Sequence, residues 1–448
     1  MKFIAGALLL CLASTAGATN LVGGGATLPA IGYTGSATFP TPTGPITPGA
    51  GSLFGVYNSA SGNTSTYCPI GSGGGKKVLA GNDSANFQVN LACGPTTTPA
   101  TPQGFGGSGL AQADFAASDA PMSSSEFNNY RTGHGSTTQP VQLPAIAGSI
   151  AVVFKKTGVT SLTLSEGQIC GVFSGQITDW KQLVSTVSGP IRVVFRSDGS
   201  GTSFSFLNHL SAVCPTNKVA AGLNPNLPSG TNFAFNFKTN QVFSGLDALG
   251  QPTGASAYVT SYAANAGASG NAGVTAAVNA VDGSIGYAEA ANGITAPAAF
   301  ASVTNSHSGL SVNPSTGFGT TAVAVSLSYD QAISDSVTAS VPGTNAPIAG
   351  RPILQALPTT SQCIAVVNPN DYADPSTGYP ILAVTYLLAN AQANANTAAV
   401  RGLLFSPYNT TSRTSVTKIG RILTGYAWLS NADLSNTTGL AKVNSCVN

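Results

Sequence analysis

The stretch "IRVVFRSDGSGTSF" (residues 191–204) carries the pattern that decides the fold. Its first five residues form a short apolar run that is typical of a buried strand. One arginine, one acid, two glycines and several hydroxyl residues follow. This pattern predicts a strand that leads through a glycine-containing turn into a hydroxyl-rich helix. Such an arrangement directs several backbone N–H groups at one spot, where the helix dipole favours an anion. We interpret the stretch as one wall of an anion site, although a capped helix after a loop explains Ser200 and Gly201 about as well.

Each polar residue of this stretch has an expected role. Ser200, Gly201 and Thr202 occupy the first helical turn, where amides lack partners within the helix. Arg196, at the end of the strand, adds a bidentate guanidinium contact to the anion. Asp198 is expected to hold that guanidinium in place.

Short strand-like and helix-like segments alternate along the chain, which predicts an α/β fold. Residues 149–156, "SIAVVFKK", predict a buried strand. Residues 164–175, "LSEGQICGVFSG", predict a helix, because Ser165 and Gln168 have the spacing of a capping box and Gly175 fits the end. Residues 379–405 predict a strand that passes into an alanine-rich helix.

The N-terminus predicts export. Residues 1–18 combine an early lysine, an apolar core and a small-residue ending, which is typical of a signal peptide cleaved after Ala18. Leu10 precedes Cys11 where a lipid-attachment site needs a small residue, so we do not expect a lipoprotein. No other stretch is long and apolar enough to cross a bilayer, so we expect a soluble mature chain that is periplasmic or secreted.

Six cysteines remain after cleavage, and an even number in an exported chain predicts disulfides. Fifteen pairings are open, and we favour nearest neighbours because each pair then closes within one sub-region. The absence of CxxC or Cys/His clustering argues against a metal site, and we expect no metal and no cofactor. The candidates are Cys68, Cys93, Cys170, Cys214, Cys363 and Cys446.

The composition excludes several classes of protein. Charged residues make up only 7% of the chain and the net charge is +2, which argues against a nucleic-acid surface or a polybasic membrane patch. Hydrophobic residues make up 42%, which argues against disorder. Two stretches rich in Pro, Thr and Gly, at 37–51 and 94–109, are expected to form extended surface loops.

Three further stretches offer ligand groups beside small residues that let a ligand approach the backbone. "GGGATLP" (23–29) places Thr27 and Leu28 after a run of glycines. "IGSGGGKK" (70–77) places Ser72 among glycines, and "ADFAASDAPMS" (113–123) places Asp119 in a small-residue turn.

Taken in order, these stretches resemble the substrate-binding proteins of phosphate-specific ABC import systems, and especially their DING-type branch. The resemblance implies a two-lobed periplasmic-binding-protein (type II) fold with a hinge, phosphate in the cleft, a membrane permease as partner, and no enzymatic activity. We expect a monomer that does not bind nucleic acid. The segments that carry the resemblance are "GGGATLP" (23–29), "GSGGGK" (71–76), "ASDAPMS" (117–123), "ICGVFSGQITDW" (169–180), "VVFRSDGSGTSFSF" (193–206) and "GSIGYAE" (283–289).

The resemblance also implies a ligand set. Thr27, Leu28 and Ser72 would offer hydroxyls and amides from one lobe, and Arg196 with residues 200–202 would act from the other. Asp119 would accept a proton from phosphate, whereas fully ionised sulfate would leave this buried charge unpaired.

The same resemblance places the lobes at 19–148, 149–378 and 379–448, with the first lobe discontinuous. The sequence departs from the family after the first motif, where "AIGYTGSATFPTPTG" predicts that the first helix is shortened or replaced. Leu28 stands where transport proteins commonly have phenylalanine, and a backbone contact tolerates either residue.

Three other classes of protein fit parts of the sequence. A nucleotide P-loop fails on spacing, because Ile70 and Lys77 stand where glycine and Ser or Thr are required. A phosphatase would need Ser72 or Ser200 as nucleophile with a histidine base, but His209 lies about two helical turns beyond Ser200. We expect it and the other histidines, His134 and His307, to be packing or surface residues. A secreted adhesin fits the low charge but leaves Asp119 and Arg196 unexplained.

Overall fold

The computed structural model describes residues 18–36, 45–81, 88–89, 93, 95–96, 113–175, 177–214, 237–243, 267–295, 299–335 and 350–448. The predicted signal peptide and most of the two Pro/Thr/Gly-rich stretches lie outside these residues, and both interpretations stay predictions. In the described part of the chain, no helix has the length and apolar character needed to span a membrane.

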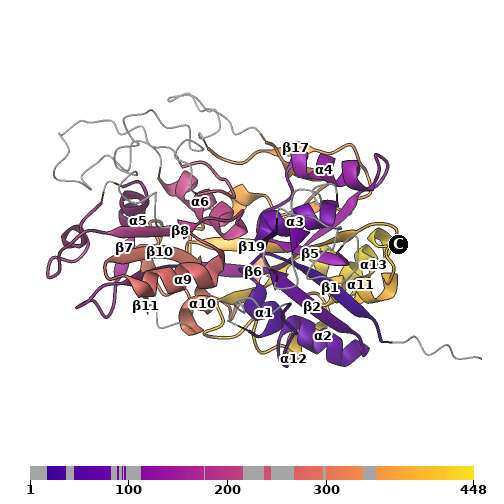
Figure 1. The fold of residues 1–448 in the computed structure, drawn as a ribbon, viewed down its shortest axis with the longest axis horizontal. Helices are drawn as coiled ribbons and strands as arrows, with labels where there is room; N and C mark the ends of the chain where they lie inside the picture. Colours follow the sequence, from indigo (N-terminus) through magenta and orange to yellow (C-terminus); the bar gives the residue numbers. More distant parts are fainter. Residues whose placement is uncertain are drawn as a thin grey trace, which may run out of the picture.

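One long strand, β6 (Pro140–Lys155), runs through both halves of the molecule (Figure 1). Its first part pairs antiparallel with β19 (Leu382–Asn390), and its second part pairs antiparallel with β10 (Ser284–Glu289). All of its residues except the last are buried. The strand predicted at 149–156 is therefore the second part of a strand that starts earlier.

The first half of the molecule is built on the parallel strands β2 (Thr64–Pro69), β1 (Asn20–Gly25) and β5 (Phe115–Ser118). Strand β19 joins β5 to β6, and β20 (Tyr426–Ser430) also pairs with β6. The helices of this half are α1 (Ala30–Thr34), α2 (Leu53–Ser61), α3 (Ser72–Ala80), α4 (Ser124–His134), α11 (Thr397–Phe405), α12 (Thr410–Ser415) and α13 (Asn436–Cys446).

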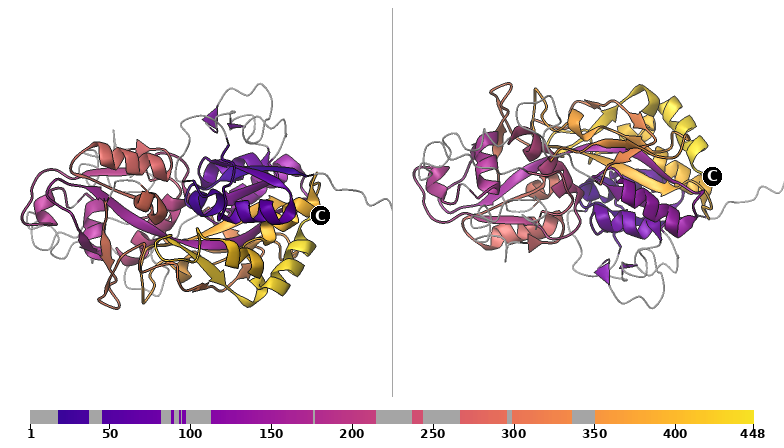
Figure 2. Two further views of the ribbon diagram at one scale, coloured as in Figure 1. Left: turned by 90° about the horizontal axis from the view of Figure 1, so that it is seen from below. Right: turned by 90° about the horizontal axis from the view of Figure 1, so that it is seen from above.

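The second half continues the sheet from β10 through parallel β8 (Arg192–Arg196) to parallel β9 (Gly267–Ala268). Figure 2 shows the two halves side by side, with the long strand crossing between them. The helices of this half are α5 (Glu166–Phe173), α6 (Gly201–Val213), α9 (Gly270–Ala280) and α10 (Ala290–Thr295).

Short strands and 3-10 turns complete the described chain. The strands are β3 (Gln88–Val89), β4 (Pro95–Thr96), β7 (Thr163–Ser165), β11 (Ala299–Phe300), β12 (Ser302–Thr304), β13 (Ser311–Val312), β14 (Val323–Ala324), β15 (Ser328–Tyr329), β16 (Gln331–Ile333), β17 (Leu354–Ala356) and β18 (Ala365–Val366). The 3-10 turns are Trp180–Gln182, Pro369–Asp371 and Ala432–Leu434.

Several predicted elements are confirmed. The run at 191–195 forms β8, and α5 starts with the predicted capping box, in which Ser165 and Gln168 exchange both hydrogen bonds. The first helix is short, as expected, because Gly35 adopts a φ of 81° directly after α1. Residues 379–405 form β19 and α11, although α11 begins only at Thr397.

The exact lobe boundaries stay a prediction. Before residue 379, the chain already lies against the first half, because β14 pairs with β20 and Ile333 bridges to Ser123. Gln142 of β6 also bridges to Ile364. These pairings favour a return to the first lobe earlier than residue 379.

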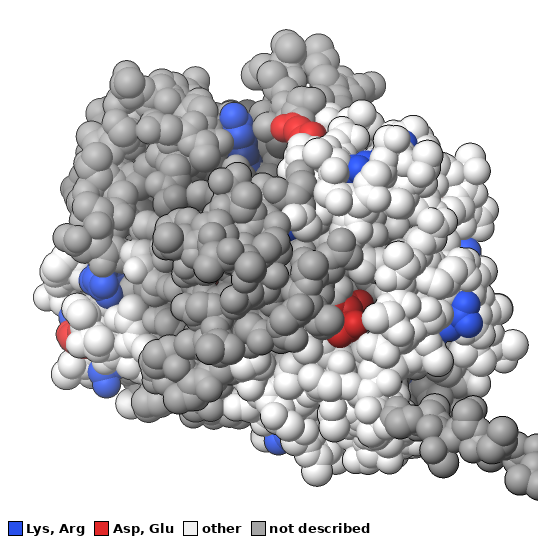
Figure 3. Space-filling view, turned by 45° about the vertical axis from the view of Figure 1, so that its right-hand side comes forward, with Lys and Arg blue, Asp and Glu red and all other residues white. Residues whose placement is uncertain are grey.

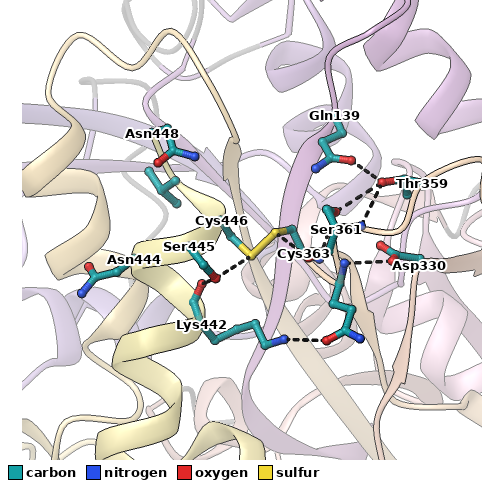
Figure 4. Close-up of a disulfide and its surroundings, with 12 residues drawn as sticks. Gln139, Asp330, Thr359, Ser361, Cys363, Lys442, Asn444, Ser445, Cys446 and Asn448 are labelled. Carbon is teal, nitrogen blue, oxygen red and sulfur yellow. Dashed lines mark hydrogen bonds between the residues drawn. A yellow bond between two sulfur atoms is a disulfide. The ribbon is translucent and has the colours of Figure 1, made fainter.

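Three disulfides join the six cysteines in the nearest-neighbour order that the sequence favoured. They are Cys68–Cys93, Cys170–Cys214 and Cys363–Cys446. The last of these connects the segment before β18 to the C-terminal helix, and the Lys442 ammonium group donates to Gln362 beside it at 3.3 Å (Figure 4).

Charged side chains are sparse on the surface. On the face drawn in Figure 3, those of the described residues lie singly or in small groups among uncharged ones. This distribution agrees with a chain in which only 7% of residues are charged.

Removing the Cys363–Cys446 disulfide tests its contribution to stability. The bond closes a loop with a sequence separation of 83, so the double variant Cys363→Ala/Cys446→Ala should lose about 4 kcal/mol of unfolding free energy. Urea denaturation measures this loss. The neighbouring Ser445→Ala variant serves as a control and should stay within about 0.5 kcal/mol of wild type. An equally small change in the unfolding free energy of the double variant would show that the disulfide does not stabilise the fold.

Candidate anion-binding site

Asp119 follows strand β5 and is the centre of the site. Its side chain is 1% exposed, and its Oδ1 atom has no hydrogen-bond partner among the described residues. Ser72, the first residue of α3, holds it on one side: the Ser72 Oγ atom accepts the Asp119 amide at 2.9 Å and donates to Oδ2 at 3.4 Å. A buried acceptor that lacks a partner is rare and indicates room for a hydrogen-bond donor from a ligand.

Thr27 and Leu28 follow the neighbouring strand, β1. The backbone of Leu28 opposes the rise in the pKa of Asp119, while the Thr27 Oγ1 atom is buried without a partner in the described part of the chain. Strands β1 and β5 are parallel neighbours, with Gly25 opposite Ala117, so their following loops meet at one edge of the sheet. Ligands of open α/β sheets bind at the carboxyl ends of the strands, where these residues lie.

Helix α3 is glycine-rich because the sheet approaches it closely. A Cβ atom on Gly75 would lie 2.6 Å from the Gly25 Cα atom of β1. Gly71 precedes the helix with a φ of 92°, a conformation that favours glycine. Lys76 is buried and pairs with Glu126 at 2.6 Å, so it is engaged inside the first half, and the P-loop interpretation has no support.

Arg196 stands at the end of β8 and is 1% exposed. Its bidentate contact is with Asp198, through Nε to Oδ1 at 2.7 Å and through Nη2 to Oδ2. Its Nη1 atom donates to Thr202 at 3.3 Å and to Asn271 at 3.1 Å. These four bonds leave a single guanidinium N–H without a partner among the described residues. The expected support of Arg196 by Asp198 is observed, and the expected contact of the guanidinium with an anion stays a prediction.

The Arg196–Asp198 ion pair is held in its charged form. Burial lowers the pKa of Arg196, but the adjacent Asp198 outweighs this effect, and the net pKa is raised. Burial raises the pKa of Asp198, and the guanidinium outweighs this effect in turn, so its net pKa is lowered. Arginine charge is therefore present at the site but is already neutralised by its partner.

Helix α6 brings the second half into contact with the first. Ser200 caps the helix by accepting the Ser203 amide at 3.0 Å. A Cβ atom on Gly201 would lie only 2.3 Å from the Ser72 Oγ atom. Across the same junction, the Gly73 amide donates to the Gly199 carbonyl at 3.0 Å. The two halves are therefore closed on each other, and the predicted ligand residues lie around one junction.

Burial controls the charge of Asp119. Loss of solvent raises its pKa to about 7, and the opposing effects of Arg196, the Ser72 hydroxyl and Lys76 do not cancel that rise. The two nearby cations already have carboxylate partners, Asp198 and Glu126. The ligand-free site thus holds an acid that is half-ionised near neutral pH.

Sequence reasoning missed three residues that support Arg196. The Tyr287 hydroxyl accepts the Arg196 amide at 3.2 Å and bonds Ser203 at 2.6 Å. The Gly270 amide donates to Asp198 at 3.1 Å, and Asn271 bonds Nη1 as described above. Tyr287 lies in the quoted motif "GSIGYAE", whereas the helix start at Gly270 carried only a weak glycine signal.

The histidines are engaged away from the two candidate nucleophiles. His209 is buried and its Nδ1 atom bonds the Ala373 carbonyl at 2.8 Å. The His134 Nε2 atom bonds the Leu79 carbonyl, and His307 lies beside Asp374 on the surface. Trp180 is a core residue, and its indole N–H donates to the Gly283 carbonyl at 3.0 Å.

The chain matches a known family over most of its length. The profile described as "PBP superfamily domain" matches residues 41–399. The chain belongs to the PBP superfamily. This PBP-superfamily chain is 32% identical to "Alkaline phosphatase L" of Pseudomonas aeruginosa over 240 residues, which cover 53% of this chain and 54% of that protein. It is 28% identical to "Phosphate-binding protein PstS" of Xylella fastidiosa over 39% of this chain and 41% of that protein. The chain thus spans about half the length of the curated relatives it matches.

Solved structures resemble this PBP-superfamily chain along nearly its whole length. A phosphate-binding protein from Stenotrophomonas maltophilia gives a TM-score of 0.57 at 25% identity and covers 94% of this chain and 93% of its own. The periplasmic phosphate-binding protein PfluDING gives a TM-score of 0.55 at 25% identity and covers 95% of this chain and 93% of its own. The predicted family, with its DING-like branch, and the two-lobed type II fold are confirmed.

Asp119 should make the stability of the ligand-free protein depend on pH. Because its pKa rises from 3.8 in the unfolded chain to about 7 in the folded one, the folded state keeps a proton that the unfolded state releases. Raising the pH through this window should therefore lower the unfolding free energy of wild type, by up to about 4 kcal/mol relative to Asp119→Asn. Urea titrations from pH 4 to pH 8 measure the difference.

The surface residue Asp282 offers a matched control for this titration. Hydrogen bonds from Thr157 lower its pKa, so Asp282→Asn should not reproduce the effect. Parallel stability curves for wild type and Asp119→Asn would contradict the raised pKa.

Proposed function

We propose that this chain binds inorganic phosphate in the cleft between its two halves. The observation that carries the proposal is the buried, unpartnered Oδ1 atom of Asp119, which lies beside hydroxyl and amide donors. Monohydrogen or dihydrogen phosphate can donate a proton to that oxygen and accept hydrogen bonds from the surrounding groups. Sulfate has no proton to donate at neutral pH, so one of its negatively charged oxygens would face the negatively charged carboxylate with no hydrogen between them.

The proposed ligand groups are those expected from the sequence. Thr27, Leu28, Ser72 and Asp119 would act from the first half, and Arg196, Ser200, Gly201 and Thr202 from the second. Asp198 supports Arg196 and does not need to touch the ligand. Because Asp198 already neutralises the guanidinium, binding would depend chiefly on aligned neutral donors. Such a buried site should respond weakly to salt.

Similar proteins favour a role in uptake. PfluDING is a high-affinity periplasmic phosphate-binding protein whose solved structure has phosphate bound. We propose that this chain is likewise exported, acts as a monomer, and delivers phosphate to an ABC permease. Hinge closure of the halves would bury the anion and present one closed surface to that partner. Lobes near 19–148, 149–378 and 379–448 belong to the same proposal, with an earlier return favoured by the pairing of β14.

Hydrolysis is not favoured, although one relative is named an alkaline phosphatase. A hydrolytic serine needs a base within hydrogen-bond reach. The three histidines, which are the expected bases, instead contact Ala373, Leu79 and Asp374, and the Ser200 hydroxyl caps α6. A surface-adhesion role alone would leave the buried carboxylate and guanidinium without a purpose.

Calorimetric titration with phosphate and sulfate tests the ligand. Wild-type protein stripped of ligand should bind phosphate and bind sulfate at least about a hundredfold more weakly, because sulfate leaves a buried charge unpaired. Asp119→Asn replaces the carboxylate by an amide and should narrow this ratio. The absence of heat with phosphate would overturn the proposed function, and equal affinities in wild type would remove the role of Asp119.

Gly201→Ala tests whether closure of the halves is needed. The added Cβ atom would lie 2.3 Å from the Ser72 Oγ atom and 2.6 Å from the Asp119 Cβ atom, so the halves must separate. We expect phosphate affinity to fall at least about tenfold. Small-angle scattering should show compaction by phosphate in wild type but not in the variant. Gly273→Ala, whose Cβ meets nothing closer than 3.7 Å, is the matched control.

A further inference from the structure

Asn271 is a buried amide that joins the ion pair to the start of α6. Its side chain is 1% exposed at the first turn of α9. Its Oδ1 atom accepts from Arg196 Nη1 at 3.1 Å, and its Nδ2 atom donates to Thr202 Oγ1 at 3.3 Å. Gly270, with a φ of 70°, directs its own amide to Asp198 at 3.1 Å. One turn therefore contacts both members of the ion pair and Thr202.

The orientation of the Asn271 amide follows from its neighbours. A guanidinium has only donors, so the atom facing Arg196 must be the amide oxygen. The amide nitrogen then faces Thr202, and because an amide nitrogen only donates, the Thr202 oxygen must accept.

This orientation restricts the Thr202 hydroxyl. Its Oγ1 atom accepts from Asn271 and also from Arg196 Nη1 at 3.3 Å. A hydroxyl oxygen has two acceptor positions and one hydrogen. With both acceptor positions occupied, only the hydrogen is left for a further bond.

We propose that Asn271 is a positioning residue that makes Thr202 an obligate hydrogen-bond donor to the bound anion. This inference rests on the proposed function, because the anion is the phosphate assigned to the cleft. Asn271 itself does not touch the ligand; it acts through Thr202 and through the orientation of Arg196.

The same logic sharpens the selectivity of the cleft. The Ser200 Oγ atom accepts the Ser203 amide and keeps its hydrogen for a further bond. The wall contributed by the second half therefore presents donors, whereas Asp119 presents the acceptor from the first half. A ligand fits when it offers acceptors on one side and a single proton on the other.

A double-mutant cycle with Thr202→Val tests the proposal. Valine keeps the shape of threonine but removes the hydroxyl. By calorimetry, Asn271→Ala should weaken phosphate binding about tenfold in the wild-type background. In the Thr202→Val background the same change should cost clearly less, because the hydroxyl through which Asn271 acts is gone.

Two further variants of α9 serve as a control and as an alternative test. Asn279→Ala makes the same substitution near the other end of α9 and should leave phosphate affinity unchanged. Asn271→Asp keeps the volume and the oxygen that faces Arg196 but replaces the donor to Thr202 by an acceptor. It should weaken binding at least as much as Asn271→Ala, and it serves if the alanine variant fails to fold. Thermal unfolding without ligand confirms that each variant is folded.

The outcomes separate this inference from the proposed function. Equal losses for Asn271→Ala in both backgrounds would overturn the action through Thr202 while leaving phosphate binding intact. Unchanged affinity in Asn271→Ala or Asn271→Asp would also overturn it. No phosphate binding by wild type would overturn the proposed function and this inference together.

Discussion

A carboxylate buried beside a neutralised arginine is the constraint on which the site depends. Asp119 has one oxygen without a partner among the described residues, and the nearest arginine charge is already bound to Asp198. Burying a carboxylate costs free energy unless a hydrogen-bond donor bonds its unpartnered oxygen. The fold must therefore hold two loops and one helix start of the first half, and one helix start of the second, around a single point. A ligand that carries both acceptors and a proton would offset this cost.

The many glycines of the chain serve this convergence. Gly25 and Gly75 let α3 lie directly against β1, which sets Ser72 beside Asp119. At the junction of the halves, Gly201 lies directly against Ser72 and Asp119, where an added Cβ atom would lie 2.3 Å from the Ser72 Oγ atom and hold the halves apart. Glycine is entropically costly in a helix such as α3. Its presence there is explained by close approach, and not by flexibility of a loop.

Local patterns in the sequence were sufficient for several elements of the fold, but not for the side-chain contacts of the candidate site. The capping box of α5, the strand before Arg196 and the short first helix depend on neighbouring residues, and all are observed. The contact between Arg196 and Asn271 was not predicted, because the two residues lie 75 positions apart in the chain. The start of β6 was missed for a similar reason, since its pairing with β19 joins distant parts of the chain.

The disulfides show how stability and closure are kept separate. Cys170–Cys214 ties α5 to the end of α6 within the second half, while Cys363–Cys446 lies within the first half. Cys68–Cys93 starts from β2, also in the first half. None of these bonds joins the two halves. Each half is therefore braced internally, and their mutual position is left to the strands that cross between them and to weak contacts at the junction. Weak contacts of this kind, such as the bond between Gly73 and Gly199, can be made and broken as an anion enters and leaves.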